Sequence, residues 1–389
     1  MTSLTLPLTD GGTETYTLSG TPVARPTAPH QFNRIAFGAA HVVPNPSAAI
    51  DPWLETSVDW ERTMAFRHHL WDLGLAVAEA MDTAQRGMGL DWPTALELMR
   101  RSIGEARSRD DATVFCGVGT DHLAPSGSLT IDAVKDAYST QIEAVEAEGG
   151  RLIVMASRAL AAAAKKPEDY VDVYGNLLRQ VSEPVILHWL GDMFDPALAG
   201  YWGHDEIDAA MEICLTVIEE NAAKVDGIKI SLLDKDKEIA MRKRLPEGVR
   251  MYTGDDFNYA ELIAGDGEHA SDALLGIFDS IAPVASAALA ALAAGDMAKY
   301  YVLFEPTVPL SRHIFRAPTR FYKTGVVFLA WLNDHQPAFT MVGGQESARS
   351  AVHFAELFRL ADAAGLLDNP DLAADRFAGW LSVHSGIER

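Results

Sequence analysis

Residues 224–233 read Lys-Val-Asp-Gly-Ile-Lys-Ile-Ser-Leu-Leu, a short apolar run with one lysine, Lys229, at its centre. Side chains alternate between the two faces of a β-strand, so Ile228 and Ile230 share one face and Lys229 lies on the other. In a parallel barrel the first face packs on helices and the second faces the lumen. Burial disfavours the charged form of a lysine, and a neutral amine is a nucleophile. The segment therefore predicts a parallel barrel with a chemically unusual lysine inside it; the alternative is a lysine at a strand end that extends to solvent.

Eight segments of this kind recur along the chain. Their starts lie roughly 25 to 40 residues apart, which leaves room for a helix and two loops each time. The expected strands are residues 35–43, 75–81, 113–118, 151–156, 184–189, 225–231, 249–253 and 274–278. Eight βα units in one chain favour an α/β fold of the TIM (β/α)8 barrel type. A doubly wound open sheet is the second choice, because no G-x-G-x-x-G follows the first strand.

Both ends of the chain extend beyond this repeat. Residues 1–33 are rich in Thr, Gly and Pro, and two β-like runs flank Asp10-Gly11-Gly12, a pattern that predicts a β-hairpin. After the eighth strand the chain contains at least three further helices, more than a minimal barrel requires. We therefore expect an N-terminal β-hairpin appendage at 1–33, the barrel at 34–280, and a C-terminal helical extension at 281–389 packed on the barrel.

The composition of the chain indicates which kinds of binding partner it lacks and in which cell compartment it is expected. A net charge of −22 argues against binding nucleic-acid phosphates or anionic membrane surfaces. No uninterrupted apolar stretch of about 18 residues appears, and the N-terminus lacks a basic segment followed by an apolar one. The two cysteines, Cys116 and Cys214, are flanked by apolar residues and are typical of buried thiols in a reducing compartment. These features predict a cytoplasmic protein that binds neither nucleic acid nor membrane.

The residues that follow the expected strands are unusually polar. In TIM barrels the active site lies at the C-terminal ends of the strands. The polar segments at these positions are 82–87, 119–122, 157–158, 188–192 and 254–256. Their common location predicts one active site at the mouth of the barrel.

The order of motifs resembles a known family. The motifs are Asp82-Thr83-Ala84-Gln85, Thr113 to Gly119, Pro184 to His188, Gly227-Ile228-Lys229, Tyr252 to Asp256 and Ser280 to Pro283. Over roughly residues 34–340 this order is similar to the dihydrodipicolinate synthase and N-acetylneuraminate lyase superfamily of class I aldolases. Gly227-Ile228-Lys229 matches the family's Schiff-base lysine motif. The resemblance implies a TIM barrel, an imine between Lys229 and a carbonyl substrate, no cofactor or metal, and a homo-oligomer, either a dimer or a tetramer.

The chain also departs from the family pattern. His188 stands where the family has a proton-relaying tyrosine, and only Thr83 remains of a threonine pair. Ser157 and Arg158 follow the fourth strand, where the family often has paired tyrosines that are associated with its dimer contact. The loop after His188 contains Asp192 in place of an arginine that grips a substrate carboxylate. These departures indicate a divergent branch with a changed substrate and proton path.

We assign roles to the residues at the expected mouth. Lys229 is the expected nucleophile, and His188 is the expected proton shuttle because a neutral imidazole acts as acid or base near pH 7. Thr83 completes the catalytic set implied by the resemblance. The expected substrate-binding residues are Asp82, Asp121, Arg158, Asp192 and Asp255; a carboxylate accepts hydrogen bonds from substrate hydroxyls, and an arginine grips a carboxylate.

Each assignment has a structural alternative. In this alternative, His188 is a core histidine bonded to a backbone carbonyl, and Thr83 caps a loop. Arg158 then forms a surface ion pair, and Asp255 is a helix N-cap. Glu79, inside an apolar strand, is the expected ion-pair partner of the buried lysine.

The leading hypothesis is a class I (Schiff-base) lyase or aldolase that acts on a keto acid or sugar-derived carbonyl substrate. The second is a metal-dependent barrel enzyme, since histidine and carboxylate ligands suit Zn²⁺ or Mn²⁺. Its candidate ligands are His122, His188, Asp82, Asp121 and Asp192. The third is a barrel that binds a ligand or partner without catalysis, against which the retained lysine argues.

Overall fold

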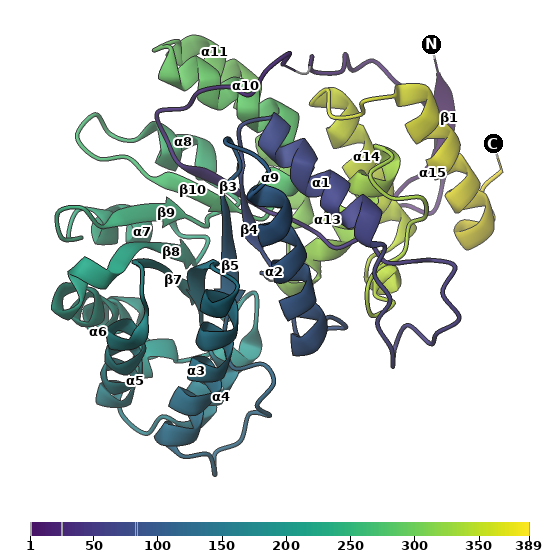
Figure 1. The fold of residues 1–389 in the computed structure, drawn as a ribbon. Coiled ribbons are helices and arrows are strands. Elements are labelled where there is room, and N and C mark those ends of the chain that lie inside the picture. Colours follow the sequence, from purple (N-terminus) through teal and green to yellow (C-terminus); the bar gives the residue numbers. More distant parts are fainter. Residues whose placement is uncertain (1, 25, 82, 84, 389) are drawn as a thin grey trace. The chain divides into compact units, whose positions relative to one another are not determined.

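The structure is a computed structural model that describes residues 2–24, 26–81, 83 and 85–388 (Figure 1). Its internal contacts divide the chain into two compact units. We call Arg34–Ala40 with Ala76–Gly276 the barrel unit, and Met1–Asn33 with His41–Leu75 and Ile277–Arg389 the helical unit. The contacts therefore group residues 41–75 with the hairpin and the C-terminal helices, whereas the expected boundaries lay at 33 and 280.

Within the described residues, eight parallel strands form a closed barrel, which confirms the predicted fold class. The strands are β3 (Ala36–Ala39), β4 (Ala76–Glu79), β5 (Val114–Val118), β6 (Arg151–Met155), β7 (Val185–Leu190), β8 (Val225–Ser231), β9 (Arg250–Thr253) and β10 (Asp272–Leu275). Each overlaps an expected strand. The eighth strand was expected to extend to residue 278. That end was wrong, because Phe278 lies in a short helix, α9 (Ile277–Ser280). A short apolar run does not by itself distinguish a strand from a buried helix.

Aromatic side chains fill much of the barrel lumen. The ring of Phe37 meets those of Phe115 and Tyr252 edge-on, at centroid distances of 5.2 and 5.9 Å. Gly227 leaves space for Tyr252, since a Cβ at position 227 would lie 2.6 Å from a carbon of the tyrosine ring. Ile186 on β7 belongs to the same core and pairs with Gly227 on β8. The register therefore establishes which face of β7 and β8 points into the lumen.

The helices of the barrel unit lie outside its strands (Figure 1). Side-chain caps mark where several of them begin: Asp91 accepts from the amide of Thr94 at 3.0 Å, and Ser157 from that of Leu160 at 2.9 Å. The helix α4, directly after β6, is too short to show helical periodicity and was not expected. The helices are α2 (Trp92–Ala106), α3 (Ile131–Ala147), α4 (Arg158–Ala163), α5 (Pro167–Gln180), α6 (Ile207–Glu220), α7 (Lys235–Arg242) and α8 (Tyr259–Ala264).

The helical unit contains the predicted hairpin, in which β1 (Ser3–Pro7) and β2 (Thr13–Thr17) pair antiparallel. Buried Asp362 anchors the segment after β2: its carboxylate accepts from Tyr16 Oη at 2.8 Å and from the amides of Ser19 and Gly20 at 2.9 and 3.1 Å. The hairpin therefore packs on the C-terminal helices of its own unit. Besides α9, its helices are α1 (Trp60–Asp72), α10 (Ala282–Ala293), α11 (Met297–Phe304), α12 (Thr307–Ile314), α13 (Tyr322–Leu332), α14 (Ala351–Ala363) and α15 (Pro370–Ser385).

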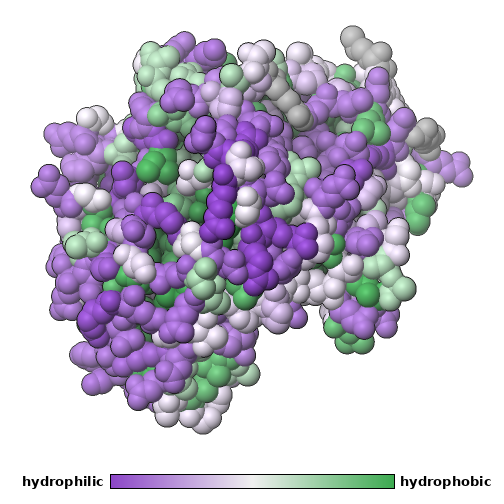
Figure 2. Space-filling model, in the orientation of Figure 1, coloured by the Kyte–Doolittle hydropathy of each residue, from purple (hydrophilic) through white to green (hydrophobic). Residues whose placement is uncertain are grey.

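On the face that Figure 2 shows, hydrophilic residues predominate and hydrophobic residues form small separate groups. This face offers no broad apolar surface of the kind that marks a large interaction site. None of the helices in the described part of the chain combines the length and hydropathy needed to cross a membrane.

One buried carboxyl of the barrel unit is held in its neutral form. Glu238 on α7 accepts hydrogen bonds from Ser271 Oγ at 2.7 Å and Thr253 Oγ1 at 2.9 Å. Burial raises the pKa of Glu238 to about 8, although these hydrogen bonds and the charge of Arg242 oppose the rise. The neutral carboxyl therefore joins α7 to the segments around β9 and β10.

Glu238→Gln should change how stability depends on pH. Between the ordinary glutamate pKa and about 8 the folded carboxyl keeps a proton that the unfolded chain releases, so the wild type loses stability as pH rises. The contribution is about 1.4 kcal/mol per pH unit for one proton. Chemical denaturation between about pH 5 and pH 9 should show a shallower loss for Glu238→Gln. An unchanged slope would contradict the prediction; Glu261→Gln, on an exposed side chain, is the control.

Candidate active site

Lys229 lies on the lumen face of β8. It is two residues from Gly227, whose β7 partner Ile186 belongs to the barrel core, so the alternation places the lysine on the inner face as well. The residue is 7% exposed. The lysine near the C-terminal end of its strand is therefore inside the barrel, as the sequence pattern predicted.

His188 stands beside Lys229. The two residues are direct partners in the β7–β8 ladder, and parallel strands in register present partners to the same face. His188 is 1% exposed, and its Nε2 lies 3.3 Å from Ser231 Oγ. Burial, and then the positive charge of Lys229, lower the pKa of His188 well below its ordinary value. The imidazole is therefore neutral near pH 7, so one of its ring nitrogens is a hydrogen-bond donor and the other is an acceptor.

Gly254, after β9, provides the space in which the lysine side chain lies. A Cβ at this position would come within 2.8 Å of Lys229 Cε, 2.6 Å of the Ile230 carbonyl oxygen and 2.3 Å of Ser231 Oγ. Two of these atoms belong to the side chains of the candidate site. Any larger residue at position 254 must displace them.

A cavity of about 80 Å³ opens next to this pair, over the ends of β5, β6 and β7. It has room for several water-sized groups. Its polar wall includes Arg86, Thr120, Asp121, Ser157, Arg158, His188 and Asp195. Two residues expected at the mouth, His188 and Arg158, line this cavity, whereas the expected catalytic residues Lys229 and Thr83 are not among the residues that line it. His188 thus borders the cavity and is at the same time the strand partner of Lys229.

Two pairs of hydrogen-bonded hydroxyl groups meet at Ser157, on the wall of the cavity. Thr120 Oγ1 is 2.5 Å from Ser157 Oγ, and both side chains are buried. The backbone amide of Ser157 donates to Tyr201 Oη at 3.0 Å. Tyr201 Oη also lies 2.9 Å from Tyr174 Oη. Burial raises the pKa of Tyr174 and of Tyr201 well above the ordinary tyrosine value. The hydroxyls are therefore neutral groups that hold one another and the start of α4 in place.

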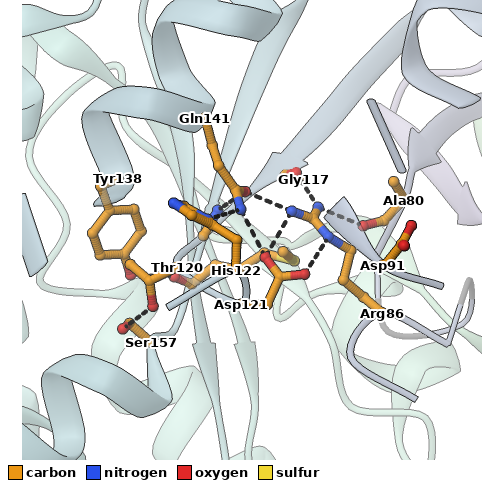
Figure 3. Close-up of polar contacts among 12 residues, drawn as sticks. Ala80, Arg86, Asp91, Gly117, Thr120, Asp121, His122, Tyr138, Gln141 and Ser157 are labelled. Carbon is orange, nitrogen blue, oxygen red and sulfur yellow. Dashed lines mark hydrogen bonds and ion pairs between the residues drawn. The ribbon is translucent and has the colours of Figure 1, made fainter. Parts of the chain in front are cut away.

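Arg86 is the centre of a second polar network (Figure 3). Its Nε and Nη2 donate to the two carboxylate oxygens of Asp121, both at 2.9 Å, and its Nη1 donates to the carbonyls of Ala80 and Gly117. Gln141 joins the network by donating to Asp121 Oδ1 at 2.8 Å and accepting from Arg86. The bidentate pair is nearly buried, so the arginine stabilises the loop after β4, in which Ala80 has a positive φ of 53°.

This network determines the state of Asp121, one of the expected substrate-binding residues. Burial would raise its pKa, but the charge of Arg86 and the hydrogen bonds from Arg86 and Gln141 hold the pKa below the ordinary value. The carboxylate is ionised, lines the cavity and is already bound by protein donors.

The other expected substrate-binding residues lie in different settings. Arg158 pairs through Nε with Asp195 at the edge of the cavity, and Asp192 is exposed in the loop after β7. Asp255 accepts from the amides of Phe257 and Asn258 at 2.8 and 3.1 Å and so caps a turn. The expected alternative, a helix N-cap, was wrong, because Asn258 is the N-cap of α8. Asp82 lies outside the described residues.

Glu79 does not share the lumen with the lysine. Its neighbour Ala78 belongs to the barrel core, so the Glu79 side chain points to the opposite face, where Ser102 Oγ of α2 donates to its carboxylate. Thr83 is buried in the loop after β4, outside the lining of the cavity.

Sequence reasoning missed several residues at the site. Arg86, Gln141, Thr120 and Ser231 were not assigned a role. Arg86 and Thr120 do follow expected strands, so their position in the chain was a usable signal. Gln141 lies in the middle of α3, and nothing in the local sequence distinguishes it from an ordinary helix residue.

For a metal, the site offers few ligands. Across residues 2–24, 26–81, 83 and 85–388, no group of three or more His, Cys, Asp or Glu side chains has an arrangement that could hold a metal ion. His122, one of the candidate ligands, is bonded through Nδ1 to Gln141 at 2.9 Å.

Comparisons with known proteins place the fold. A family model described as "Protein of unknown function (DUF993)" matches residues 4–387, and no curated protein matches the sequence. A putative dihydrodipicolinate synthetase from Pseudomonas aeruginosa has a TM-score of 0.64 at 16% identity, over 85% of this chain and 99% of its own. Dihydrodipicolinate synthase from Thermotoga maritima has a TM-score of 0.64 at 15% identity, over 87% and 100%. The enzyme from Aquifex aeolicus has a TM-score of 0.63 at 13% identity, over 86% and 99%. The structural resemblance predicted from the motifs is confirmed at the level of the fold.

Gly254→Ala should destabilise the protein and disturb the site. The added methyl group overlaps Lys229, the Ile230 carbonyl and Ser231, and overpacking of a core costs about 1–3 kcal/mol. Urea denaturation measures the loss. The control is Gly104→Ala in α2, where a Cβ meets nothing within 4 Å and helix propensity favours alanine. Equal stability of the two variants would contradict the proposed close approach.

Proposed function

This chain belongs to the family described as "Protein of unknown function (DUF993)", and we propose that it is a class I lyase or aldolase that binds a carbonyl substrate as an imine on Lys229. The observation that carries the proposal is the pairing of Lys229 with His188 on neighbouring strands inside the barrel. A buried amine beside a neutral imidazole combines a nucleophile with an acid–base group.

In the proposed reaction the cationic amine of Lys229 first gives a proton to the neutral imidazole of His188, and the resulting neutral amine adds to the carbonyl carbon of the substrate. The proton held by His188 goes to the carbonyl oxygen, which leaves as water and gives a protonated imine. When a base removes the proton of the β-hydroxyl group, the Cα–Cβ bond breaks, the β-carbon leaves as an aldehyde, and the electron pair moves to the imine to give an enamine. Protonation of the enamine at Cα and hydrolysis of the imine release the second product and free Lys229. The reverse sequence joins two carbon fragments. The chemistry needs no bound cofactor.

His188 is the proposed proton carrier. A neutral imidazole carries a proton on one nitrogen and a lone pair on the other, so it can accept a proton from the Lys229 amine and deliver one to the departing oxygen. Ser231 Oγ, 3.3 Å from Nε2, orients the ring. The lowered pKa of His188 supports this role, because the ring remains unprotonated beside a cationic lysine. We also propose that Thr83, buried in the loop after β4, assists the proton transfer.

The proposed substrate is a hydroxylated keto acid or a sugar-derived carbonyl compound. Thr120 and Ser157 provide hydroxyls on the cavity wall, and Arg158 provides a cation at its edge. Arg158 is 40% exposed at its side chain and is paired with Asp195, so a substrate carboxylate would compete with that aspartate for the guanidinium. Asp121 and Asp192 remain proposed contacts for substrate hydroxyls, and Asp255 a positioning residue.

We further propose a homo-oligomer, a dimer or tetramer, in the cytoplasm. Two free, buried cysteines, Cys116 and Cys214, support a reducing compartment. Light scattering of the purified protein measures the number of subunits.

Borohydride trapping tests the proposed imine. Wild-type protein treated with keto acids and keto sugars should gain the mass of one substrate, irreversibly, on the peptide that contains Lys229. Lys229→Ala should abolish both adduct and turnover, and Lys229→Arg should do no better because a guanidinium is not an amine nucleophile. His188→Phe should retain part of the adduct while turnover falls roughly 100-fold.

The matched control is Lys243→Ala, which removes a half-exposed lysine of the barrel unit and should leave adduct and turnover unchanged. Full activity in Lys229→Ala would reject the proposal. Activity that a chelator abolishes and added metal restores would favour the metal-dependent alternative.

A further inference from the structure

A groove lies in the helical unit, among the hairpin and the helices α12 and α14. Its volume is about 380 Å³. The residues that line it are Pro7, Leu8, Thr9, Glu14, His313, Arg316, Val352, His353, Glu356 and Arg359. None of these residues belongs to the barrel unit, so this groove is separate from the cavity beside His188.

Two arginines and two glutamates line the groove, and both glutamates pair with the same arginine. Arg359 has acidic partners, since it pairs with Glu14 at 2.7 Å and Glu356 at 3.2 Å. Among the ion pairs of the described residues, none involves the exposed side chain of Arg316. In a chain with a net charge of −22, an arginine without a carboxylate partner is conspicuous.

A second arginine holds this region in shape. Arg349 Nη2 donates to the carbonyl oxygens of Arg316 and Pro318 at 2.7 and 3.0 Å. Its bonds are to neutral carbonyls, so its charge adds to that of Arg316. Burial, and then the charge of Arg316, lower the pKa of Arg349, which indicates that the two cations repel each other.

Two stacked histidines form another part of the groove. The rings of His313 and His353 lie 4.2 Å apart at an angle of 17°. His313 Nε2 donates to the His353 carbonyl at 2.9 Å, and the His353 ring nitrogens are buried without a hydrogen-bond partner. Burial, and then the charges of His313, Arg349 and Arg316, lower the pKa of His353 to about 2. Burial also lowers the pKa of His313.

We propose that this groove is a binding site for a small organic anion, with a carboxylate or phosphate group on Arg316 and a short apolar part against Leu8 and Val352. The anion supplies the negative partner that Arg316 lacks, next to the additional positive charge of Arg349. Arginine suits both groups because its planar fork matches their oxygens. Val352 and Leu8 favour a ligand with a hydrocarbon portion.

The site predicts a link between anion binding and proton uptake. A bound anion favours the charged form of His313, so affinity rises as pH falls. His353, whose pKa is lowered to about 2, stays neutral over the tested pH range. Protonated His313 would carry an added N–H at Nδ1. The other charged groups at the groove are Arg316, Arg349, Arg359, Glu14 and Glu356, of which the two glutamates are paired with Arg359.

Calorimetric titration of the full-length protein at low ionic strength tests the site, with sulfate, inorganic phosphate and succinate as probes. Sulfate keeps its charge between about pH 5 and pH 8, so a tighter sulfate complex at the lower pH reports protonation of the protein. Arg316→Ala should weaken binding about tenfold or more. Arg316→Lys should recover part of the affinity, because it keeps the charge and loses the fork. The relative affinities of phosphate and succinate identify which anionic group the groove prefers.

Three control variants separate this site from other sources of binding. Arg320→Ala makes the same change of charge at an arginine that lies over Phe321 and does not line the groove, and it should bind as the wild type does. Lys229→Ala and Arg158→Ala, in the barrel unit, should also leave binding unchanged. The proposal is overturned if the wild type binds none of the probes, if Arg316→Ala binds as tightly as Arg320→Ala, or if Arg158→Ala removes the binding.

Discussion

The register between β7 and β8 is the constraint on which the candidate site depends. Parallel strands present alternate side chains to the lumen, and the ladder pairs Ile186 with Gly227 and His188 with Lys229. Because Ile186 lies in the barrel core, the lysine and the histidine must both face inward. A shift of one residue would place them on the helix side of the sheet. The chemistry proposed for the barrel follows from this pairing.

Burying polar groups beside that pair requires partners for each of them. Arg86 and Asp121 neutralise each other and bond to Gln141 and to backbone carbonyls. Glu238 remains neutral instead, held by two hydroxyl groups. The barrel therefore uses both available solutions, a bonded ion pair and a protonated acid. His188 is a third case, because its ring stays neutral next to a lysine and is bonded only loosely to Ser231.

The likeness to dihydrodipicolinate synthases at 13–16% identity illustrates what a barrel conserves. The closed sheet depends on the spacing of strands and on the inward and outward alternation of side chains, which many sequences satisfy. The residues at the strand ends are free to differ without a change of fold. The fold consequently says little about the substrate. The choice of substrate depends on the side chains around the cavity, which include Arg158, Asp195, Thr120 and Ser157.

The sequence by itself determined the eight strands, the N-terminal hairpin and the inward direction of Lys229, because all three depend on local periodicity and turn residues. Only the tertiary structure decided the partners of the polar side chains. The pairing of Arg86 with Asp121 joins residues 35 positions apart, and Gln141 reaches them from a helix whose sequence marks no special role. It also decided that Glu79 faces Ser102 and that Asp255 caps a turn, since such contacts depend on which loops and helices lie side by side. Periodicity records which face a side chain occupies, whereas its partner depends on the closure of the whole barrel.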